Sequence, residues 1–309
     1  MTYEEVLLDL AERTPDLVVL TAENRAAIRN AQSRLGNRFI DVGIAEQTMI
    51  GIAAGFALRG RIPVVHALAA FLSMRAFEFI RTDVGVAGLP VKIVGGVPGF
   101  LSEANGPTHQ ALEDIALMRG IPGMHVCSPA DAGELVLALP EIIADPAPWY
   151  LRYNAREPAM RHAPWSIGRA EVISEGNDVA ILVHGMLLRE AAEAASILQS
   201  RGVSVHLVNM RTLKPADKEA ILLAAAETDV LVTIEDHFLA GGLYSIVAET
   251  LVEHQRIVPV VPLGLKERWF RPALLDDVLR YEGFTGPHLA STILRASEQR
   301  MIIDDTENA

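Results

Sequence analysis

The chain has 309 residues and a net charge of −12 at pH 7, with 39 acidic side chains against 27 Lys and Arg. This balance argues against binding to nucleic-acid phosphates, which depends on clustered cations. No uncharged apolar stretch approaches the ~20 residues that span a bilayer, and no leader-like segment is evident. The single cysteine, Cys127, cannot form an internal disulfide, which fits a reducing compartment. We therefore expect a cytoplasmic protein of about two domains that binds neither nucleic acid nor membranes.

The first half of the chain alternates between strand-like and helix-like segments. Short apolar runs predict strands at 16–20, 63–67, 91–95, 123–127 and 149–152, and helical patterns lie between them at 47–58, 73–84, 111–119 and 131–143. Such an alternation is typical of a mainly parallel sheet with helices packed on it. We expect a first α/β domain over residues 1–156.

A polar stretch rich in Pro and Gly then interrupts the pattern, and we place a linker at 157–177. The alternation resumes with predicted strands at 179–183, 203–208, 230–234 and 258–261 and helices at 187–200, 218–226 and 243–252. Strands rich in Val, Leu and Ile fit a parallel sheet that is covered on both faces. The predicted fold class is therefore α/β, with two doubly wound, mainly parallel-sheet domains, the second over residues 178–309.

Glu46 is the most informative residue of the first domain. It lies in the run Gly43-Ile44-Ala45-Glu46-Gln47, at the head of an uncharged helical segment, 48–58. A carboxylate in this position is expected to be desolvated and to hold or share a proton near neutral pH. The simpler interpretation is helix capping, because acids are favoured in the first turn of a helix.

Further motifs follow downstream. They are Ala70-Phe71-Leu72, Gly106-Pro107-Thr108-His109-Gln110, Ile121-Pro122-Gly123-Met124 and Ser128-Pro129-Ala130-Asp131. In this order and spacing, they and the Glu46 motif resemble the pyrimidine-binding half of a transketolase, and the resemblance covers most of the chain. It implies a pyrimidine-binding domain for thiamine diphosphate, followed by a transketolase C-terminal domain.

The resemblance also implies roles for individual residues. Glu46 would be catalytic and would hydrogen-bond a ring nitrogen of the cofactor's aminopyrimidine. Phe71 would stack on that ring, and Ile44 of the same motif as Glu46 would also contact the cofactor. His109 would face hydroxyl or carbonyl oxygens of the substrate and exchange protons with them. The competing interpretations are a core position for Phe71 and helix capping or solvent exposure for His109.

One part of the family's cofactor site is absent from the sequence. Transketolases hold the diphosphate and its metal with Gly-Asp-Gly and a later Asn, and no Gly-Asp-Gly occurs in this chain. The resemblance therefore implies a split, two-component transketolase in which a separate N-terminal subunit holds the diphosphate with Mg²⁺ or Ca²⁺. We expect a heterotetramer of two chains of each kind, in agreement with the 50% hydrophobic content, and no activity of this chain alone.

Some positions depart from the family pattern. Asn105 stands where transketolases usually carry the Asp that contacts a sugar hydroxyl, so the preferred hydroxyl pattern is expected to differ. Val97 and Ala27 stand near positions where the family binds substrate phosphate through His and Ser. A phosphate site normally needs several charge-assisted donors, and Arg156 is the candidate anion contact that we identify. We therefore expect an unphosphorylated or otherwise modified sugar.

The leading hypothesis is transfer of a two-carbon ketol unit from a ketose to an aldose acceptor. The alternatives are the β component of a 2-oxo acid dehydrogenase and a deoxyxylulose-phosphate-synthase-like carboligase, although Pro98 stands where that synthase places an Arg. A structural or regulatory subunit without catalysis is the non-enzyme alternative.

Two further features have weaker functional interpretations. Arg75 and Arg81 follow Phe71 on the predicted helix, and arginines at such positions are more often solvated than functional. The Glu235-Asp236-His237 run resembles a loop of the family's C-terminal domain near the subunit interface.

Overall fold

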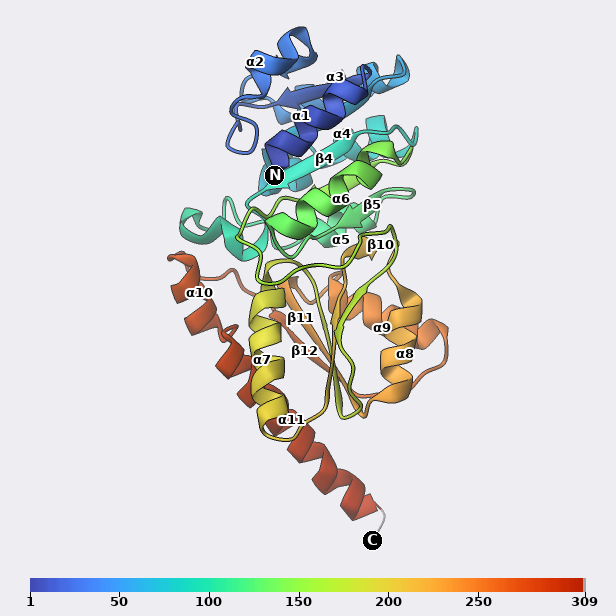
Figure 1. Ribbon diagram of the computed structural model, residues 1–309, viewed down its shortest axis with the longest axis vertical. Coiled ribbons are helices and arrows are strands. Elements are labelled where there is room, and N and C mark those ends of the chain that lie inside the picture. The colour runs from blue at the N-terminus through green and yellow to red at the C-terminus, as the bar shows by residue number, and fades with distance from the viewer. Residues whose placement is uncertain (308–309) are drawn as a thin grey trace.

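The computed structural model describes residues 1–307, with side chains described for residues 1–296. Two sheets, each covered by helices, follow one another along the long axis of the molecule, and the last helix extends away from the second sheet (Figure 1). The predicted α/β class with two mainly parallel sheets is confirmed. No helix in the described part of the chain is both long and apolar enough to cross a membrane.

The first sheet has seven strands in the order β10-β5-β6-β4-β3-β1-β2. Their bounds are β1 (Leu17–Thr21), β2 (Phe39–Asp41), β3 (Ile62–Leu68), β4 (Lys92–Gly96), β5 (His125–Cys127), β6 (Trp149–Arg152) and β10 (Thr212–Lys214). All neighbours pair in parallel except β10, which runs antiparallel to β5. The chain therefore returns to the first sheet after it has begun the second.

Helices cover both faces of this sheet because successive strand residues point to opposite sides. On β3, Val64 belongs to the cluster that packs α1 (Tyr3–Arg13), α2 (Ala31–Leu35) and α6 (Ala132–Ala144). Its neighbour Val65 belongs to the cluster that packs α3 (Glu46–Leu58) and α5 (Asp114–Arg119). The segment predicted as one helix at 73–84 is instead a short α4 (Phe77–Phe79) between the π-helical turns η2 (Phe71–Arg75) and η3 (Ile80–Gly85).

The second sheet has five strands in the order β12-β11-β8-β9-β7, with only β7 antiparallel. Its strands are β7 (Glu171–Ser174), β8 (Val179–Val183), β9 (Val205–Asn209), β11 (Val230–Phe238) and β12 (Val260–Leu265). The helices are α7 (Leu188–Ser200), α8 (Lys218–Glu227), α9 (Leu243–Glu253), α10 (Leu275–Glu282) and α11 (Gly286–Glu307), of which α7 and α11 pack together. Strand β7 lies within the segment predicted as the linker, so that segment is not irregular throughout.

The two sheets share one hydrophobic cluster. It runs from Ile115 and Met124 beside the first sheet to Leu213 on β10, and on to Ile221 on α8 and Leu231 on β11 of the second sheet. The carboxyl end of β11 reaches the loop that precedes α5, where the backbone N–H of Phe238 donates to the carbonyl of Leu112 at 2.8 Å. The second sheet thus packs against the β5–β10 edge of the first sheet and against the connection between β4 and α5.

Candidate active site

The sequence-predicted residues lie beyond the carboxyl ends of strands in the first sheet. Glu46 begins α3 after β2, and Phe71 begins η2 after β3. His109 lies in the long connection between β4 and α5. Ligands of parallel α/β sheets bind in the crevice outside these strand ends. The topology therefore places three segments that are distant in sequence at one edge of the sheet.

Glu46 is a buried carboxylate with a cationic partner. It is 2% exposed, and its Oε2 accepts a hydrogen bond from Nη1 of Arg75 at 3.1 Å. Ala45 occupies the N-cap position and makes no side-chain capping bond. The positive end of the helix dipole lies at this terminus, so Glu46 has both the first turn of α3 and the Arg75 guanidinium beside it.

Phe71 joins the two candidate catalytic residues. The guanidinium carbon of Arg75 lies 4.1 Å from the centre of the Phe71 ring, in a cation–π contact. The His109 ring packs edge-on against the same ring, with centroids 5.1 Å apart and an interplanar angle of 62°. Phe71 and His109 are both half-buried. The structure thus brings Glu46, Phe71 and His109 into one cluster, with Arg75 between the first two.

Arg75 is the member of this cluster that sequence reasoning undervalued. The sequence carries a usable signal, because Arg75 lies four residues after Phe71 and side chains at this spacing share one side of a helical turn. The actual contact depends on the π-helical turn η2, which a pattern for a regular helix does not predict.

The remaining candidates are more dispersed. Ile44 precedes Glu46 and is 70% exposed, and Asn105 is exposed at the end of the 3-10 segment η4 (Gly99–Asn105). Arg156 lines a separate cavity with Asp131 and Arg189, and its Nη1 donates to the carbonyl of Met186 at 3.3 Å. No other sequence-predicted site residue lines that cavity. The structure therefore does not bring Arg156 together with His109, and its role as an anion contact stays a prediction.

A neutral pocket lies at the carboxyl ends of β1, β3 and β4. Its lining includes Asn24, Ala27, Val97, His66 and Tyr153, and it contains no Lys or Arg. Burial lowers the pKa of His66 to about 4, so its imidazole is neutral at pH 7. The two positions that depart from the family's phosphate-binding pattern, Ala27 and Val97, thus share a pocket that offers no cation to an anionic group.

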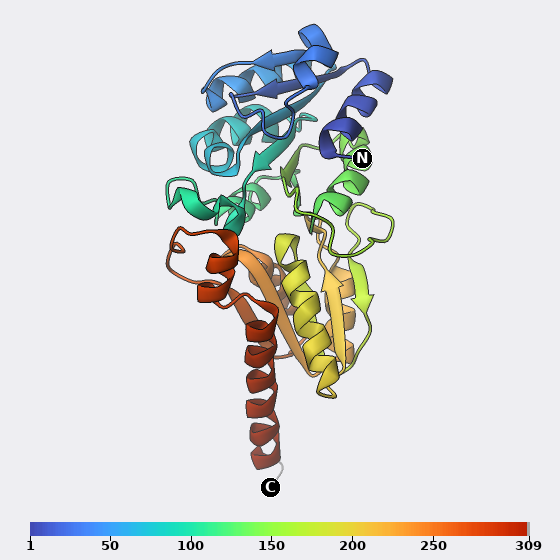
Figure 2. The same ribbon diagram turned by 60° about the vertical axis from the view of Figure 1, so that its left-hand side comes forward.

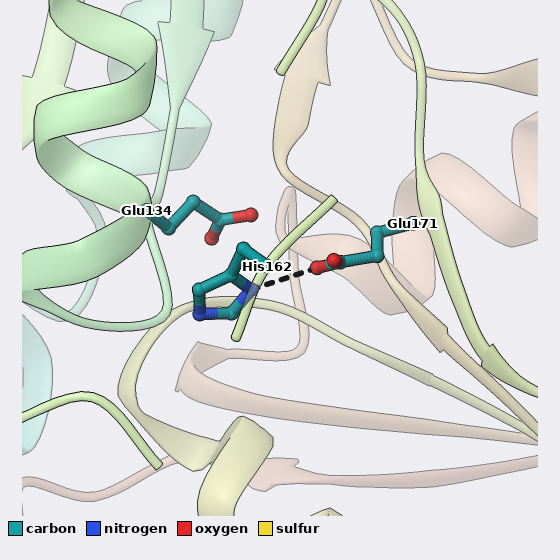
Figure 3. Close-up of side chains that lie close together, drawn as sticks. All are labelled: Glu134, His162 and Glu171. Carbon is teal, nitrogen blue, oxygen red and sulfur yellow. Dashed lines mark hydrogen bonds and ion pairs between the residues drawn. The ribbon is translucent and has the colours of Figure 1, made fainter. Parts of the chain in front are cut away.

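A second polar cluster lies between the two sheets, where Glu134, His162 and Glu171 approach one another (Figure 3). The imidazole of His162 contacts Glu171 at 2.8 Å through Nδ1 and Asp131 at 3.0 Å through Nε2. Burial alone would lower the pKa of His162, but the hydrogen bonds to Asp131 and Glu171 raise it to about 10. The ring is therefore an imidazolium without a free lone pair for a metal.

Arg211 completes this second cluster. Its guanidinium lies 2.7 Å from Glu134 and 2.9 Å from Glu171, and all three side chains are buried. The Glu134 and Glu171 carboxylates are thus already paired with two protein cations, Arg211 and His162. We interpret this cluster as a salt-bridge network that ties α6 to the second sheet.

Comparison with protein-family models gives two consecutive matches. Residues 1–159 match the transketolase pyrimidine-binding domain, and residues 168–289 match the transketolase C-terminal domain. The first match contains the whole cluster of Glu46, Phe71, Arg75 and His109.

Individual relatives agree with these matches. The chain is 38% identical over 304 residues to the 6-deoxy-6-sulfo-D-fructose transketolase subunit SqwH of Clostridium sp. (strain MSTE9), covering 96% of this chain and 92% of the relative. It is 34% identical to the putative transketolase C-terminal section of Methanocaldococcus jannaschii, covering 94% of both. It also matches 1-deoxy-D-xylulose-5-phosphate synthase of Synechococcus sp. (strain JA-2-3B'a(2-13)) at 35% identity, but spans 47% of that protein.

A solved structure has the same fold over nearly its whole length. It is described as a split gene transketolase, inactive beta4 tetramer, and superimposes with a TM-score of 0.85 at 34% identity, covering 96% of this chain and 97% of that one. The chain therefore belongs to the transketolase family, as a subunit of the kind that carries the pyrimidine-binding and C-terminal domains of a split transketolase.

Proposed function

We propose that this subunit completes the cofactor site of a two-component transketolase that transfers a two-carbon ketol unit from a ketose to an aldose. The observation that carries the proposal is the cluster in which the buried Glu46 carboxylate and the His109 imidazole flank Phe71 and Arg75. The thiamine-diphosphate dependence of the family supplies the chemistry, because the bound cofactor provides the carbon nucleophile that carries the two-carbon unit.

The residues present fit the aminopyrimidine of that cofactor. In the structure, a planar cation already occupies the place between Glu46 and Phe71, because the Arg75 guanidinium stacks on the ring and donates to the carboxylate. A planar heterocycle with a ring nitrogen directed at Glu46 has the same two complementarities, aromatic stacking and a hydrogen bond to a carboxylate. In this role Glu46 holds a proton at that ring nitrogen, and Phe71 excludes water from one face of the ring.

His109 is suited to act on the substrate. Its ring is half-buried against Phe71, and its Nδ1 lies 2.9 Å from the hydroxyl of Thr108. That contact leaves Nε2 for a hydroxyl or carbonyl oxygen of the sugar. An imidazole in this position donates a hydrogen bond as negative charge develops on the oxygen, and it exchanges a proton there. Asn105, on the same connection, is our proposal for a second hydroxyl contact.

The diphosphate and its Mg²⁺ or Ca²⁺ are assigned to a partner subunit, because this chain lacks the Gly-Asp-Gly motif. Exposed apolar side chains that neighbour Glu46 and Arg75 in the sequence support a docking surface for other chains at the cluster: Ile44 is 70% and Met74 39% exposed. Apolar side chains gathered around one site commonly mark a protein interface. A heterotetramer of two chains of each kind is the assembly that we propose, located in the cytoplasm.

The neutral pocket beneath Ala27 and Val97 supports an unphosphorylated or otherwise modified sugar as the substrate. Phosphate recognition normally uses several charge-assisted hydrogen bonds, and no Lys or Arg lines this pocket. The Clostridium relative is named for 6-deoxy-6-sulfo-D-fructose, a modified sugar whose sulfonate is itself an anion, so its name supports modification of the sugar and not loss of its charge. We further propose domain limits of 1–156 and 178–309, with 157–177 as a connecting segment that contributes β7 to the second sheet; residues 308–309 lie outside the described part of the chain.

The test is reconstitution with a partner chain that contains Gly-Asp-Gly, followed by a screen of ketose donors with and without a phosphate group. Glu46→Gln keeps the shape of the side chain and removes its charge, so we expect kcat to fall by about 10²- to 10⁴-fold, the range for a positioned proton-transfer group. Glu227→Gln at the exposed end of α8 is the matched control and is expected to retain activity. Wild-type rates in the Glu46→Gln complex, or activity of this chain alone, would contradict the proposal.

A further inference from the structure

The connection that carries His109 is held largely by the second sheet and its helices. It runs from Gly99, shortly after β4, to Glu113 before α5, and its η4 segment lies against α10 near the middle of the molecule (Figure 2). We call this connection the His109 loop (residues 99–113). A backbone N–H, a side-chain amide and a backbone carbonyl along it have hydrogen-bond partners more than 120 residues away in the sequence.

The start of the His109 loop is fixed by the carboxyl end of β11. The backbone N–H of Phe100 donates to Oδ2 of Asp236 at 3.3 Å. The Phe100 ring, which is fully buried, packs edge-on between Phe270 and Phe284, with centroid distances of 5.3 and 5.1 Å. Gly99 has a φ of +56°, and a Cβ there would lie 1.9 Å from Asp236 Oδ2. This close approach leaves the loop no freedom at its first residue.

The far end and the middle of the loop have similar anchors. The carbonyl of Leu112 accepts from the N–H of Phe238, the residue that ends β11, at 2.8 Å. Beside His109, the Gln110 side chain is fully buried, and its Nε2 donates to the carbonyl of Phe270 at 3.0 Å. The chain thus alternates between a half-buried imidazole at the candidate site and a buried amide that is bonded to the other domain.

A buried charge network lies under both ends of the loop. Arg152, at the end of β6, contacts Asp114 at 2.9 Å and Asp236 at 2.6 Å, and all three side chains are at most 2% exposed. Asp114 begins α5 directly after the loop, and Asp236 holds its start. Arg152, on β6, therefore links Asp114 at the end of the His109 loop to Asp236 at its start.

We propose that the C-terminal domain positions His109 for catalysis, with Gln110 as the positioning residue that transmits the constraint from Phe270. The inference rests on the proposed function, because it assigns His109 the substrate contact. In this proposal the C-terminal domain supports the active site through Phe270, although it lies far from Glu46 in the sequence. The amide of Gln110 acts through the backbone of its neighbour and needs no contact with substrate or cofactor.

The test compares Gln110→Met with Ser128→Ala in the reconstituted two-component enzyme. Methionine keeps the length of Gln110 and removes the donor to Phe270. Ser128→Ala is the matched control, because its buried hydroxyl makes a 3.0 Å hydrogen bond to His184 of the other domain without contacting the His109 loop. Both variants lose one buried hydrogen bond between the domains, so a general loss of stability affects both.

For Gln110→Met we expect kcat to fall by about 10- to 100-fold, because a displacement of about 1 Å of a reacting group can have an effect of that size. Thiamine-diphosphate affinity should stay within about twofold, since Glu46 and Phe71 lie on other segments, and hydrogen–deuterium exchange of peptides from residues 99–113 should accelerate in the isolated subunit. Ser128→Ala should change neither kcat nor this exchange.

Unchanged exchange of the loop in Gln110→Met, or an equal loss of kcat in both variants, would overturn the positioning role. Wild-type kcat in Gln110→Met would also overturn it. If the wild-type complex transfers no ketol unit from any donor, the proposed function fails instead. The exchange comparison then still decides whether Gln110 holds the loop, because it requires neither substrate nor partner.

Discussion

Arg152→Met probes the buried charge network that joins the two domains. In the wild-type chain one guanidinium serves two carboxylates, Asp114 and Asp236, that are 0% and 1% exposed. Methionine fills much of the same volume but leaves both carboxylates without their cation. Removing one partner of a buried ion pair costs about 3–5 kcal/mol. Because two pairs share the arginine here, we expect a loss of free energy of unfolding near the upper end, about 5 kcal/mol at pH 7.5.

The loss should depend on pH in a defined direction. Burial raises the pKa of Asp236, and Arg152 opposes that rise. Without Arg152 the folded-state pKa rises further above the unfolded value of about 3.9. A carboxyl group with a raised folded-state pKa lowers the free energy of unfolding, and the loss is complete above that pKa. The loss shrinks as the pH falls from the folded-state pKa toward the unfolded-state pKa. We therefore expect the deficit to be smaller at pH 5.5, by up to about 1.4 kcal/mol for each pH unit over which Asp236 takes up its proton.

The assay is urea unfolding followed by tryptophan fluorescence and circular dichroism at pH 7.5 and pH 5.5, with the wild-type chain measured at both. Arg169→Met is the matched control, because Arg169 forms a surface pair with Glu219 in which both side chains are more than half exposed. That variant should unfold like the wild type, since exposed ion pairs add little stability. A deficit of less than about 1 kcal/mol for Arg152→Met, the range of surface pairs, would refute the reasoning. So would a large deficit that is identical at the two pH values.

Two further predictions concern the other ionic contacts. Since hydrogen bonds to Asp131 and Glu171 outweigh burial and raise the pKa of His162 to about 10, its contribution to stability is complete below pH ~6.5 and is lost as the pH rises toward 10. Thermal unfolding of His162→Gln should lack this alkaline decline, and Zn²⁺ should leave the wild-type midpoint unchanged; stabilisation by Zn²⁺ would instead identify a metal site. Arg75→Met should cost less than about 1 kcal/mol in urea unfolding, because Arg75 is 43% exposed and its attraction to Glu46 is screened by solvent. A loss as large as that expected for Arg152→Met would contradict this.

The sequence alone predicts much of the fold because burial follows local periodicity. The apolar runs that predict strands at 63–67 and 149–152 match β3 and β6 closely, since these strands are buried on both faces. The segments it does not predict are short or at sheet edges. Strand β10 has three residues, and its pairing with β5 joins it to a sheet formed mainly from the other half of the chain. Strand β7 lies in a Pro-rich stretch and is stabilised by pairing with β9.

Sequence motifs identify Glu46, Phe71 and His109 as site candidates, because each residue lies within a motif that resembles the transketolase pattern. The four-residue spacing places Arg75 on the same side as Phe71, but the sequence alone does not show that the two side chains stack, because the segment forms a π-helical turn instead of the predicted regular helix. Nor can it show that Gln110 bonds to a carbonyl 160 residues away. The hydrophobic periodicity of the sequence indicates whether a side chain is buried, but it does not show which distant group that side chain contacts. Only the packing of the two sheets decides that the domain without catalytic motifs holds the loop of His109.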